Sequence, residues 1–569
     1  MALYRLQCDS VCFTPQVPYD DACDDGKTGT GFLVDLPEAG GKVILTAHHV
    51  VENAVTVKAT SPDKPNLDAE LLEILGYNPH LDVAILKPTP RLLEGMTPFP
   101  LGESSTLSPK DQVSALGFAN GDVKKHVTTG TISGRNEWPH NRIQTDTAIN
   151  PGNSGGPMVL EGLVVGVVTS GMDTMQSTNF FAGIDETRLA IRRIMQRLRE
   201  SEAELGVDRG FHLNAVVSAI DAAGCGGLPG GARVAGSMIG TGLEPGDVIR
   251  AVASPSGRML ELNSFMRVQD PSIWRDDTID FRVVLDNLSL TTQTATWKMR
   301  VRRNDKEVAV DVVVGRPLMY SRLLFPDCEP VQYFTFGGVV VQTNSESHGH
   351  LFKKRHLLSP EAKLVSRPVI THVVSGCPLC VHGVASIENS VLVAVVGGDG
   401  LRYECKTLQR LKTLVEELDP LIIELDTGER VGATRENMDT YEVNQANPKL
   451  KRGLHFVVRG RLASPLPTEQ AGYEATAEST PSTTSTALTP EGRLLKELAD
   501  NTDMEAEESY DVHSAYPSIW PENGGTHSRR RDAHLHEGPS LSMMPIRREL
   551  LLMHQRRPPP PRRRLFGLF

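Results

Sequence analysis

The segment Q-T-D-T-A-I-N-P-G-N-S-G-G-P, from Gln144 to Pro157, is the most informative stretch of this chain. It places a single serine, Ser154, among glycines at positions 152, 155 and 156. Glycines permit a tight, partly left-handed turn that exposes the serine hydroxyl. They also let a substrate carbonyl approach backbone amides, here those of Gly152, Asn153 and Ser154. The segment therefore predicts a nucleophilic serine beside an oxyanion hole.

A serine hydroxyl becomes a useful nucleophile only when a base takes its proton and an acceptor orients that base. The apolar run V-I-L-T-A-H-H-V-V at residues 43–51 ends in a histidine pair, and H-L-D-V-A-I-L at residues 80–86 places Asp82 before a second apolar run. We expect His49, Asp82 and Ser154 to form a catalytic triad. Their order along the chain is that of the chymotrypsin-like fold.

Together with T-G-T-G-F-L-V at residues 28–34 and V-T-T-G-T-I-S at residues 127–133, these segments closely resemble an HtrA/Deg serine protease. The resemblance covers roughly residues 2–190. Its pattern T-x-x-H-V implies that His49 is the base, and adjacent side chains on a strand point to opposite faces, so His48 cannot share that role. We expect His48 to be partly exposed and without a function, so that alanine there leaves most of the activity.

Other aspartates compete with Asp82 for the orienting role. Four of them, Asp20, Asp21, Asp24 and Asp25, lie in a loop with glycine and lysine, which is typical of solvated turns. Asp146 belongs to the family pattern, but it precedes the serine by eight residues and is expected to organise that loop.

The resemblance also places the residues that line the primary specificity pocket. These are Ala148, Ile149, Val167, Thr169 and Ile184. None of them carries a charge that could neutralise lysine or arginine. We therefore expect cleavage after small or medium aliphatic residues.

Composition excludes several classes of protein. The net charge of −11 argues against a nucleic-acid partner. No apolar stretch approaches the roughly 18 residues needed to span a bilayer. The N-terminus lacks the basic and apolar regions of an export signal, which predicts a cytoplasmic or nuclear protein. Nothing resembles a nucleotide-binding loop, and no cofactor is expected.

The eight cysteines are sparse and predict reduced thiols. One pair, in C-P-L-C-V-H at residues 377–382, has the spacing of a redox dithiol or of half a zinc site. A second C-x-x-C is missing, and His372 could complete a ligand set only if the loop folded back. We expect a structural or incidental pair and no metal.

We expect the protease domain to occupy residues 1–200 and to end in a helix over residues 186–204. Residues 208–316 contain L-x-x-G-D-x-I and resemble the PDZ domain that follows the protease in Deg proteins. That resemblance implies a site for peptide C-termini. The candidate carboxylate loop consists of Gly210, Phe211, His212 and Leu213, although it departs from the usual G-L-G-F pattern.

Residues 322–456 resemble the second PDZ domain of plant and algal Deg proteins, with an amphipathic helix over residues 406–418. No carboxylate loop is evident there, which favours a structural or interprotomer role. Residues 463–569 are rich first in Ser, Thr and Pro and then in Arg and Pro, and are predicted to be disordered. Their last residues, L-F-G-L-F, could dock in the first PDZ domain.

The predicted fold is therefore mainly β, with two six-stranded β-barrels of chymotrypsin-like type, two PDZ-like α+β domains and a disordered C-terminal tail. The predicted function is ATP-independent serine endopeptidase activity on unfolded or damaged proteins, in a homotrimer or higher homo-oligomer. The alternative is a proteolytically silent chaperone or PDZ scaffold.

Overall fold

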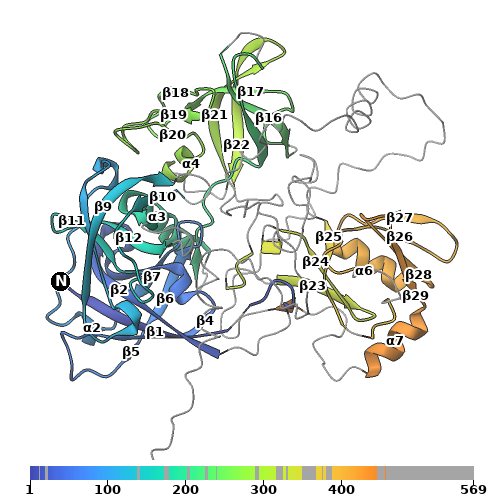
Figure 1. Cartoon of the computed structure of the whole chain (residues 1–569), viewed down its shortest axis with the longest axis horizontal. Coiled ribbons are helices and arrows are strands. Elements are labelled where there is room, and N and C mark those ends of the chain that lie inside the picture. The colour runs from blue at the N-terminus through green and yellow to red at the C-terminus, as the bar shows by residue number, and fades with distance from the viewer. Residues whose placement is uncertain are drawn as a thin grey trace, which may run out of the picture. The chain divides into compact units, whose positions relative to one another are not determined.

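The computed structural model describes most of the chain up to residue 456 (Figure 1). The described residues are 1–11, 13–18, 24–136, 141–171, 178–201, 205–224, 229–238, 240–288, 294–315, 324–327, 331–345, 347–348, 367–374, 376–379, 387–444 and 455–456. The tail from residue 463 and the proposed docking of its last residues lie outside this part of the chain.

An eight-stranded, mostly antiparallel sheet is formed mainly by the N-terminal strands, in the order β14-β6-β7-β3-β2-β1-β4-β5. Its elements are β1 (Leu3–Val11), β2 (Asp24–Leu36), β3 (Gly41–Thr46), α1 (His48–Val51), β4 (Ala54–Thr60), β5 (Glu70–Leu71), β6 (Glu73–Asn78), β7 (Val83–Lys87), α2 (Pro90–Leu93) and β14 (Gly206–Val207). The short strand β5 pairs with β4, and β14 joins β6 in parallel from beyond the barrel, so the sheet has two strands more than the six that we predicted.

A closed six-stranded barrel follows, in the order β10-β13-β12-β11-β8-β9. Its strands are β8 (Gln112–Gly117), β9 (His126–Asn136), β10 (Arg142–Thr145), β11 (Pro157–Leu160), β12 (Leu163–Gly171) and β13 (Asn179–Gly183). Sheet and barrel share one apolar core, in which Phe32 and Ile85 meet Phe118 and Val164. Sequence patterns therefore predicted the mainly β class and one closed barrel correctly.

Helix α3 (Ile184–Ser201) follows the barrel directly and lies within three residues of the predicted bounds. Its fully buried residues Ala190, Ile191 and Ile194 join the same shared core, and the helix packs on β6, β12 and β14. The helical period places these side chains on one face, as the sequence indicated.

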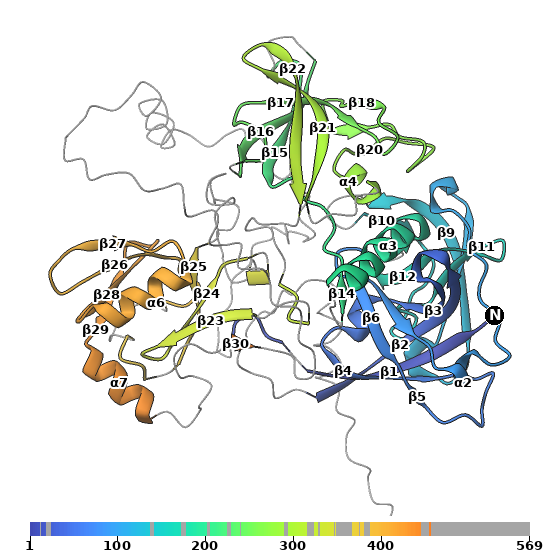
Figure 2. The ribbon, with the colours of Figure 1, turned by 180° about the vertical axis from the view of Figure 1, so that it is seen from behind.

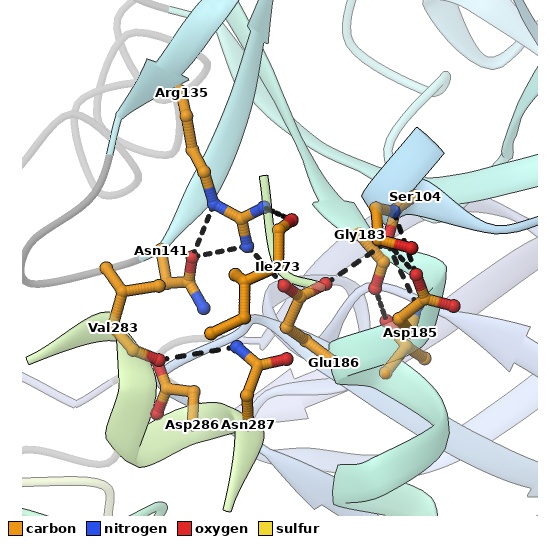
Figure 3. A network of polar contacts seen from close by, with 12 residues as sticks. Ser104, Arg135, Asn141, Gly183, Asp185, Glu186, Ile273, Val283, Asp286 and Asn287 are labelled. Atoms are coloured by element: carbon orange, nitrogen blue, oxygen red, sulfur yellow. Dashed lines mark hydrogen bonds and ion pairs between the residues drawn. The ribbon is translucent and has the colours of Figure 1, made fainter. Parts of the chain in front are cut away.

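A buried polar network links the barrel to the residues that follow it (Figure 3). Arg135 donates to the side chain of Asn141 at 2.7 and 2.9 Å, to the carbonyl of Ile273 at 3.2 Å, and to Glu186. Arg135 and Glu186 are nearly inaccessible to solvent, so their charges compensate each other in a poorly solvated place. Ser104 also donates to Glu186, at 3.2 Å.

The chain after α3 contains a sheet in the order β15-β16-β17-β21-β22, to which β18 adds at β17. Its elements are β15 (Ala215–Ile220), β16 (Gly231–Ser237), β17 (Val248–Ala253), β18 (Met259–Glu261), β19 (Arg267–Val268), β20 (Ile279–Asp280), α4 (Val283–Asn287), β21 (Thr294–Arg303) and β22 (Lys306–Gly315). The long hairpin β21–β22, seen from behind in Figure 2, closes this part of the chain and pairs Thr294–Arg303 with Lys306–Gly315.

The region after residue 330 contains two four-stranded sheets, β25-β24-β23-β30 and β27-β26-β28-β29. Its elements are β23 (Val331–Phe336), β24 (Val339–Thr343), β25 (Pro368–Val373), β26 (Leu392–Val396), β27 (Arg402–Glu404), α6 (Leu408–Glu417), β28 (Leu421–Leu425), β29 (Arg430–Ala433), α7 (Arg435–Asn444) and β30 (His455–Phe456). Helix α6 matches the predicted amphipathic helix and buries Leu411, Leu414 and Val415. No helix in the described part of the chain is both long and apolar enough to cross a bilayer.

Candidate active site

His49 and Asp82 meet at the N-terminus of the one-turn helix α1. The Nδ1 atom of His49 lies 2.8 Å from Oδ2 of Asp82, and the backbone amide of His49 donates to Oδ1 at 2.8 Å. The amide of His48 donates to the backbone carbonyl of Asp82 at 3.1 Å. Asp82 therefore caps the helix and holds the ring of His49 in one orientation, with Nδ1 occupied and Nε2 left for other chemistry.

Asp82 is held as an anion although it is only 2% exposed. Burial by itself would raise its pKa, but the ring of His49 and the guanidinium of Arg142 outweigh that effect and lower the pKa to about 2. Arg142 lies on β10 of the barrel, with Nη2 3.8 Å from Oδ2 of Asp82. Sequence motifs do not identify Arg142, because β10 meets Asp82 only in the folded chain.

A tight turn precedes Ser154. The amide of Asn153 donates to the carbonyl of Asn150 at 2.9 Å, and Gly152 has a φ of +96°, which together are typical of a type II turn. The carbonyl of Pro151 accepts a hydrogen bond from Asn120 at 2.5 Å, so the trans peptide directs the Gly152 N–H the opposite way. A Cβ at position 152 would lie 2.2 Å from the Phe118 carbonyl, which excludes other residues there.

This turn corrects one of the predicted oxyanion donors. The amide of Asn153 is used inside the turn and cannot also reach a substrate oxygen. In the described part of the chain, the amides of Gly152 and Ser154 donate to no protein acceptor. Two amides, not three, are therefore available to stabilise a negative oxygen.

Thr30 on β2 fixes this turn from the N-terminal sheet, and sequence reasoning did not identify it. Its hydroxyl donates to the carbonyl of Gly152 at 2.6 Å and accepts from the amide of Phe118 at 3.0 Å. Its own amide donates to the carbonyl of Ser154 at 2.9 Å. Thr30 is fully buried, so these bonds join sheet, barrel and turn in a place without water.

The hydroxyl of Ser154 donates to the carbonyl of Thr169 at 3.3 Å. Among the residues that the structure describes, no hydrogen bond joins this hydroxyl to His49. Rotation about χ1 of Ser154 moves its hydroxyl between alternative acceptors. Catalytic hydrogen bonds are often long or absent before substrate binds. The structure therefore pairs His49 with Asp82, while the Ser154 hydroxyl is bonded to the carbonyl of Thr169.

His48 differs from what the sequence predicted. The two histidines lie on a one-turn helix and not on a strand, and His48 is 3% exposed. Its Nε2 atom lies 3.0 Å from Oδ2 of Asp327. The expectation of a partly exposed histidine was wrong, because Asp327 is 279 residues away and only the fold brings it here.

The predicted pocket residues fall into two groups. Val167 and Ile184 are fully buried in the core shared by sheet and barrel. Ala148 is exposed and Ile149 is half-buried, while the carbonyl of Thr169 faces the Ser154 hydroxyl. Only these last three residues have the accessibility or the position to meet a substrate side chain.

Asp146 serves the loop, as the sequence indicated. Its Oδ1 accepts from the Thr131 amide at 2.5 Å, and its Oδ2 accepts from the Thr131 hydroxyl at 3.1 Å. It therefore holds the segment before Ser154 against β9.

Two amides of the predicted carboxylate loop already donate hydrogen bonds within the chain. His212 and Gly315 exchange backbone hydrogen bonds of 2.6 and 3.2 Å, and the amide of Gly210 donates to Asp208 at 3.3 Å. Phe211 and Leu213 are buried in the core. A peptide carboxylate needs amides that are not yet bonded, so the amides of Gly210 and His212 are poorly suited to receive one.

Cys377 is buried in the core of the region after residue 330. Cys380 and His382 lie outside the described residues, so the predicted pair cannot be placed. The residues that are described contain no cluster of side chains arranged to hold a metal ion.

A comparison with known protein families shows which class of enzyme domain residues 29–167 resemble. Residues 29–167 match the family described as trypsin-like peptidase domain, and this range includes His49, Asp82 and Ser154. The chain thus carries a trypsin-like peptidase domain.

Two relatives narrow the class. A probable periplasmic serine endoprotease, DegP-like, from Chlamydia muridarum is 39% identical over 153 residues, which are 26% of this chain and 29% of the relative. A protein of the same name from Hahella chejuensis is 34% identical over 255 residues, which are 42% of this chain and 50% of the relative. The matched part of the chain is similar to HtrA/Deg serine proteases, as the sequence motifs indicated.

The match spans half or less of the length of these relatives. A solved structure, the HtrA-type protease AlgW with a decapeptide, is 25% identical, covers 56% of this chain and 96% of its own, and has a TM-score of 0.39.

The expected cytoplasmic or nuclear location is wrong on this comparison, because both relatives are named as periplasmic. Location is set by targeting segments, and the motifs of a catalytic domain carry no such information.

Proposed function

We propose that this protein is a serine endopeptidase in which Ser154 attacks a peptide carbonyl, His49 transfers protons and Asp82 orients His49. The observation that supports the proposal is the pair of bonds from His49 to Asp82, together with a turn in which the Gly152 amide has no protein acceptor among the described residues. During attack, the Ser154 proton passes to Nε2 of His49, and the negative carbonyl oxygen meets the amides of Gly152 and Ser154. The same proton then goes to the leaving amine.

Unfolded or damaged proteins are the proposed substrates, cleaved without ATP in a homo-oligomer. The uncharged residues Ala148, Ile149 and Thr169 support cleavage after small or medium aliphatic residues. A peptide-library digest tests this point, and a preference for Arg or Lys would refute it. Two chymotrypsin-like barrels and two PDZ-like domains, within residues 1–200, 208–316 and 322–456, belong to the same proposal.

A second candidate, a proteolytically silent scaffold, is favoured by one observation: the Ser154 hydroxyl bonds to Thr169 and not to His49. Casein digestion separates the two candidates. The wild type should digest casein and react with a fluorophosphonate at Ser154. In contrast, Ser154→Ala should lose roughly 10⁶-fold in rate. A wild type that neither cuts casein nor reacts with the fluorophosphonate would establish the scaffold.

A further inference from the structure

The helix that carries His49 is held by two aspartates from distant parts of the chain. Asp82 bonds to its N-terminus, as described above. The second aspartate, Asp327, is fully buried and comes from the four described residues 324–327, which follow the β15–β22 domain.

Asp327 binds the first residue of α1 and the chain just after the end of that helix. Its Oδ2 lies 3.0 Å from Nε2 of His48, the first residue of the helix. The same oxygen accepts from the amide of Asn53 at 3.3 Å, two residues beyond the last residue of α1. The backbone carbonyl of Asp327 accepts from the hydroxyl of Tyr77 on β6 at 2.7 Å. One residue thus ties the start of α1, the chain just after its end and a neighbouring strand.

Apolar contacts hold the same segment in place. The ring of Phe325 meets the rings of His48 and His80 edge-on, with centroids 5.8 and 5.9 Å apart. Phe325 also packs on the core that contains Val50 and Val51 of α1.

The electrostatic environment of His48 is consistent with an ion pair between His48 and Asp327. Burial disfavours a charge on His48, but Asp327, with smaller contributions from Glu52 and Asp82, outweighs burial and raises the pKa of His48. Removing one partner of a buried ion pair is strongly destabilising, because it leaves the other charge uncompensated. Asp327 therefore cannot leave without disturbing the first turn of α1.

We propose that Asp327 is a positioning residue for catalysis: through His48 and Asn53 it fixes the helix that presents His49 to Ser154. The inference rests on the proposed peptidase function. It makes the active site depend on a segment beyond the peptidase domain. Leu324, at the start of that segment, packs with Tyr333 and Val340 of the following region, so the segment connects that region to the catalytic helix.

The test uses the full chain with Asp327→Ala, which removes both bonds, and Asp327→Asn, which keeps an oxygen acceptor. Asp311→Ala is the matched control, because Asp311 is exposed on β22. A displacement of about 1 Å in a catalytic group costs about 10²-fold, so kcat of Asp327→Ala on a peptide substrate should fall by about ten- to a hundredfold with KM near the wild-type value. Asp327→Asn should recover part of that loss.

A second readout does not need turnover. In the Ser154→Ala background, the proton between His49 and Asp82 gives a low-field NMR signal, and Asp327→Ala should shift or broaden it. A folded Asp327→Ala protein with wild-type kcat and an unchanged signal would overturn the inference. If Asp327→Ala does not fold, Asp327→Asn decides by the same two measurements. A wild type that fails to react with a fluorophosphonate refutes the peptidase function instead, and the NMR signal alone then decides on Asp327.

Discussion

The hydroxyl of Thr30 should matter for catalysis more than for the fold. We expect Thr30→Val to lower kcat strongly, whereas Thr30→Ser should behave almost like the wild type. Valine has the shape of threonine but lacks the hydroxyl, so the change isolates the two hydrogen bonds to Gly152 and Phe118.

The magnitude follows from what those bonds hold. A buried polar group left without its partner costs about 1–3 kcal/mol, and Thr30→Val leaves two such groups. The turn at Gly152 can reduce this cost by shifting, which moves the amide that receives the substrate oxygen. Loss of one oxyanion donor costs about 10²–10³-fold in kcat. We therefore expect a fall in kcat of about 10²-fold, with the free energy of unfolding reduced by roughly 2 kcal/mol.

The assay is hydrolysis of a peptide substrate, with kcat and KM determined separately and unfolding followed in urea. Since the donor acts on the transition state, KM should change little. Folded Thr30→Val with wild-type kcat would refute the reasoning. So would Thr30→Ser that is as slow as Thr30→Val, because serine keeps the hydroxyl.

Two further predictions concern pH. Burial raises the pKa of Asp286 to about 7 against the opposing effect of Arg193, so the folded protein keeps a proton there that the unfolded chain releases above pH 4. The free energy of unfolding should therefore fall as pH rises from about 4 to 7. At pH 8, Asp286→Asn should be more stable than the wild type by on the order of 2 kcal/mol, whereas at pH 4 the two should be equally stable. Thermal unfolding at the two pH values tests this. For Asp82 the dependence on pH has the opposite sign. Its pKa is lowered to about 2, so its contribution to the free energy of unfolding is complete above about pH 4 and is lost as pH falls toward 2. Arg142→Gln removes a cation beside Asp82, so the loss of stability and activity at low pH should begin at a higher pH than in the wild type. If the two proteins lose activity and stability at the same low pH, Arg142 does not act on Asp82.

The local motifs could be interpreted from the sequence because their chemistry is local. Glycines around Ser154 are needed by a turn of four residues, and an aspartate before an apolar strand is a short pattern. The helical spacing of apolar residues likewise placed the helices α3 and α6. Such patterns hold wherever a segment folds by contacts with its own neighbours.

The error at His48 and the omission of Thr30 arose because each residue's partner is far away in sequence. His48 was expected on a strand and in solvent, but Asp327 binds it and Asp82 starts a helix there. Thr30 gave no signal, since a threonine in a strand becomes a positioning group only when β2 meets the turn at Gly152.

By itself, the sequence determined that this is a mainly β chain with a trypsin-like peptidase domain, a glycine-lined serine, and a histidine and an aspartate to serve it. Tertiary structure alone decided which amides remain for an oxyanion, which groups keep Asp82 charged, and which distant segment holds the helix of His49. The physical reason is that turns and periodicity depend on neighbours along the chain, whereas buried hydrogen bonds and charges depend on whatever the fold brings within about 3 Å.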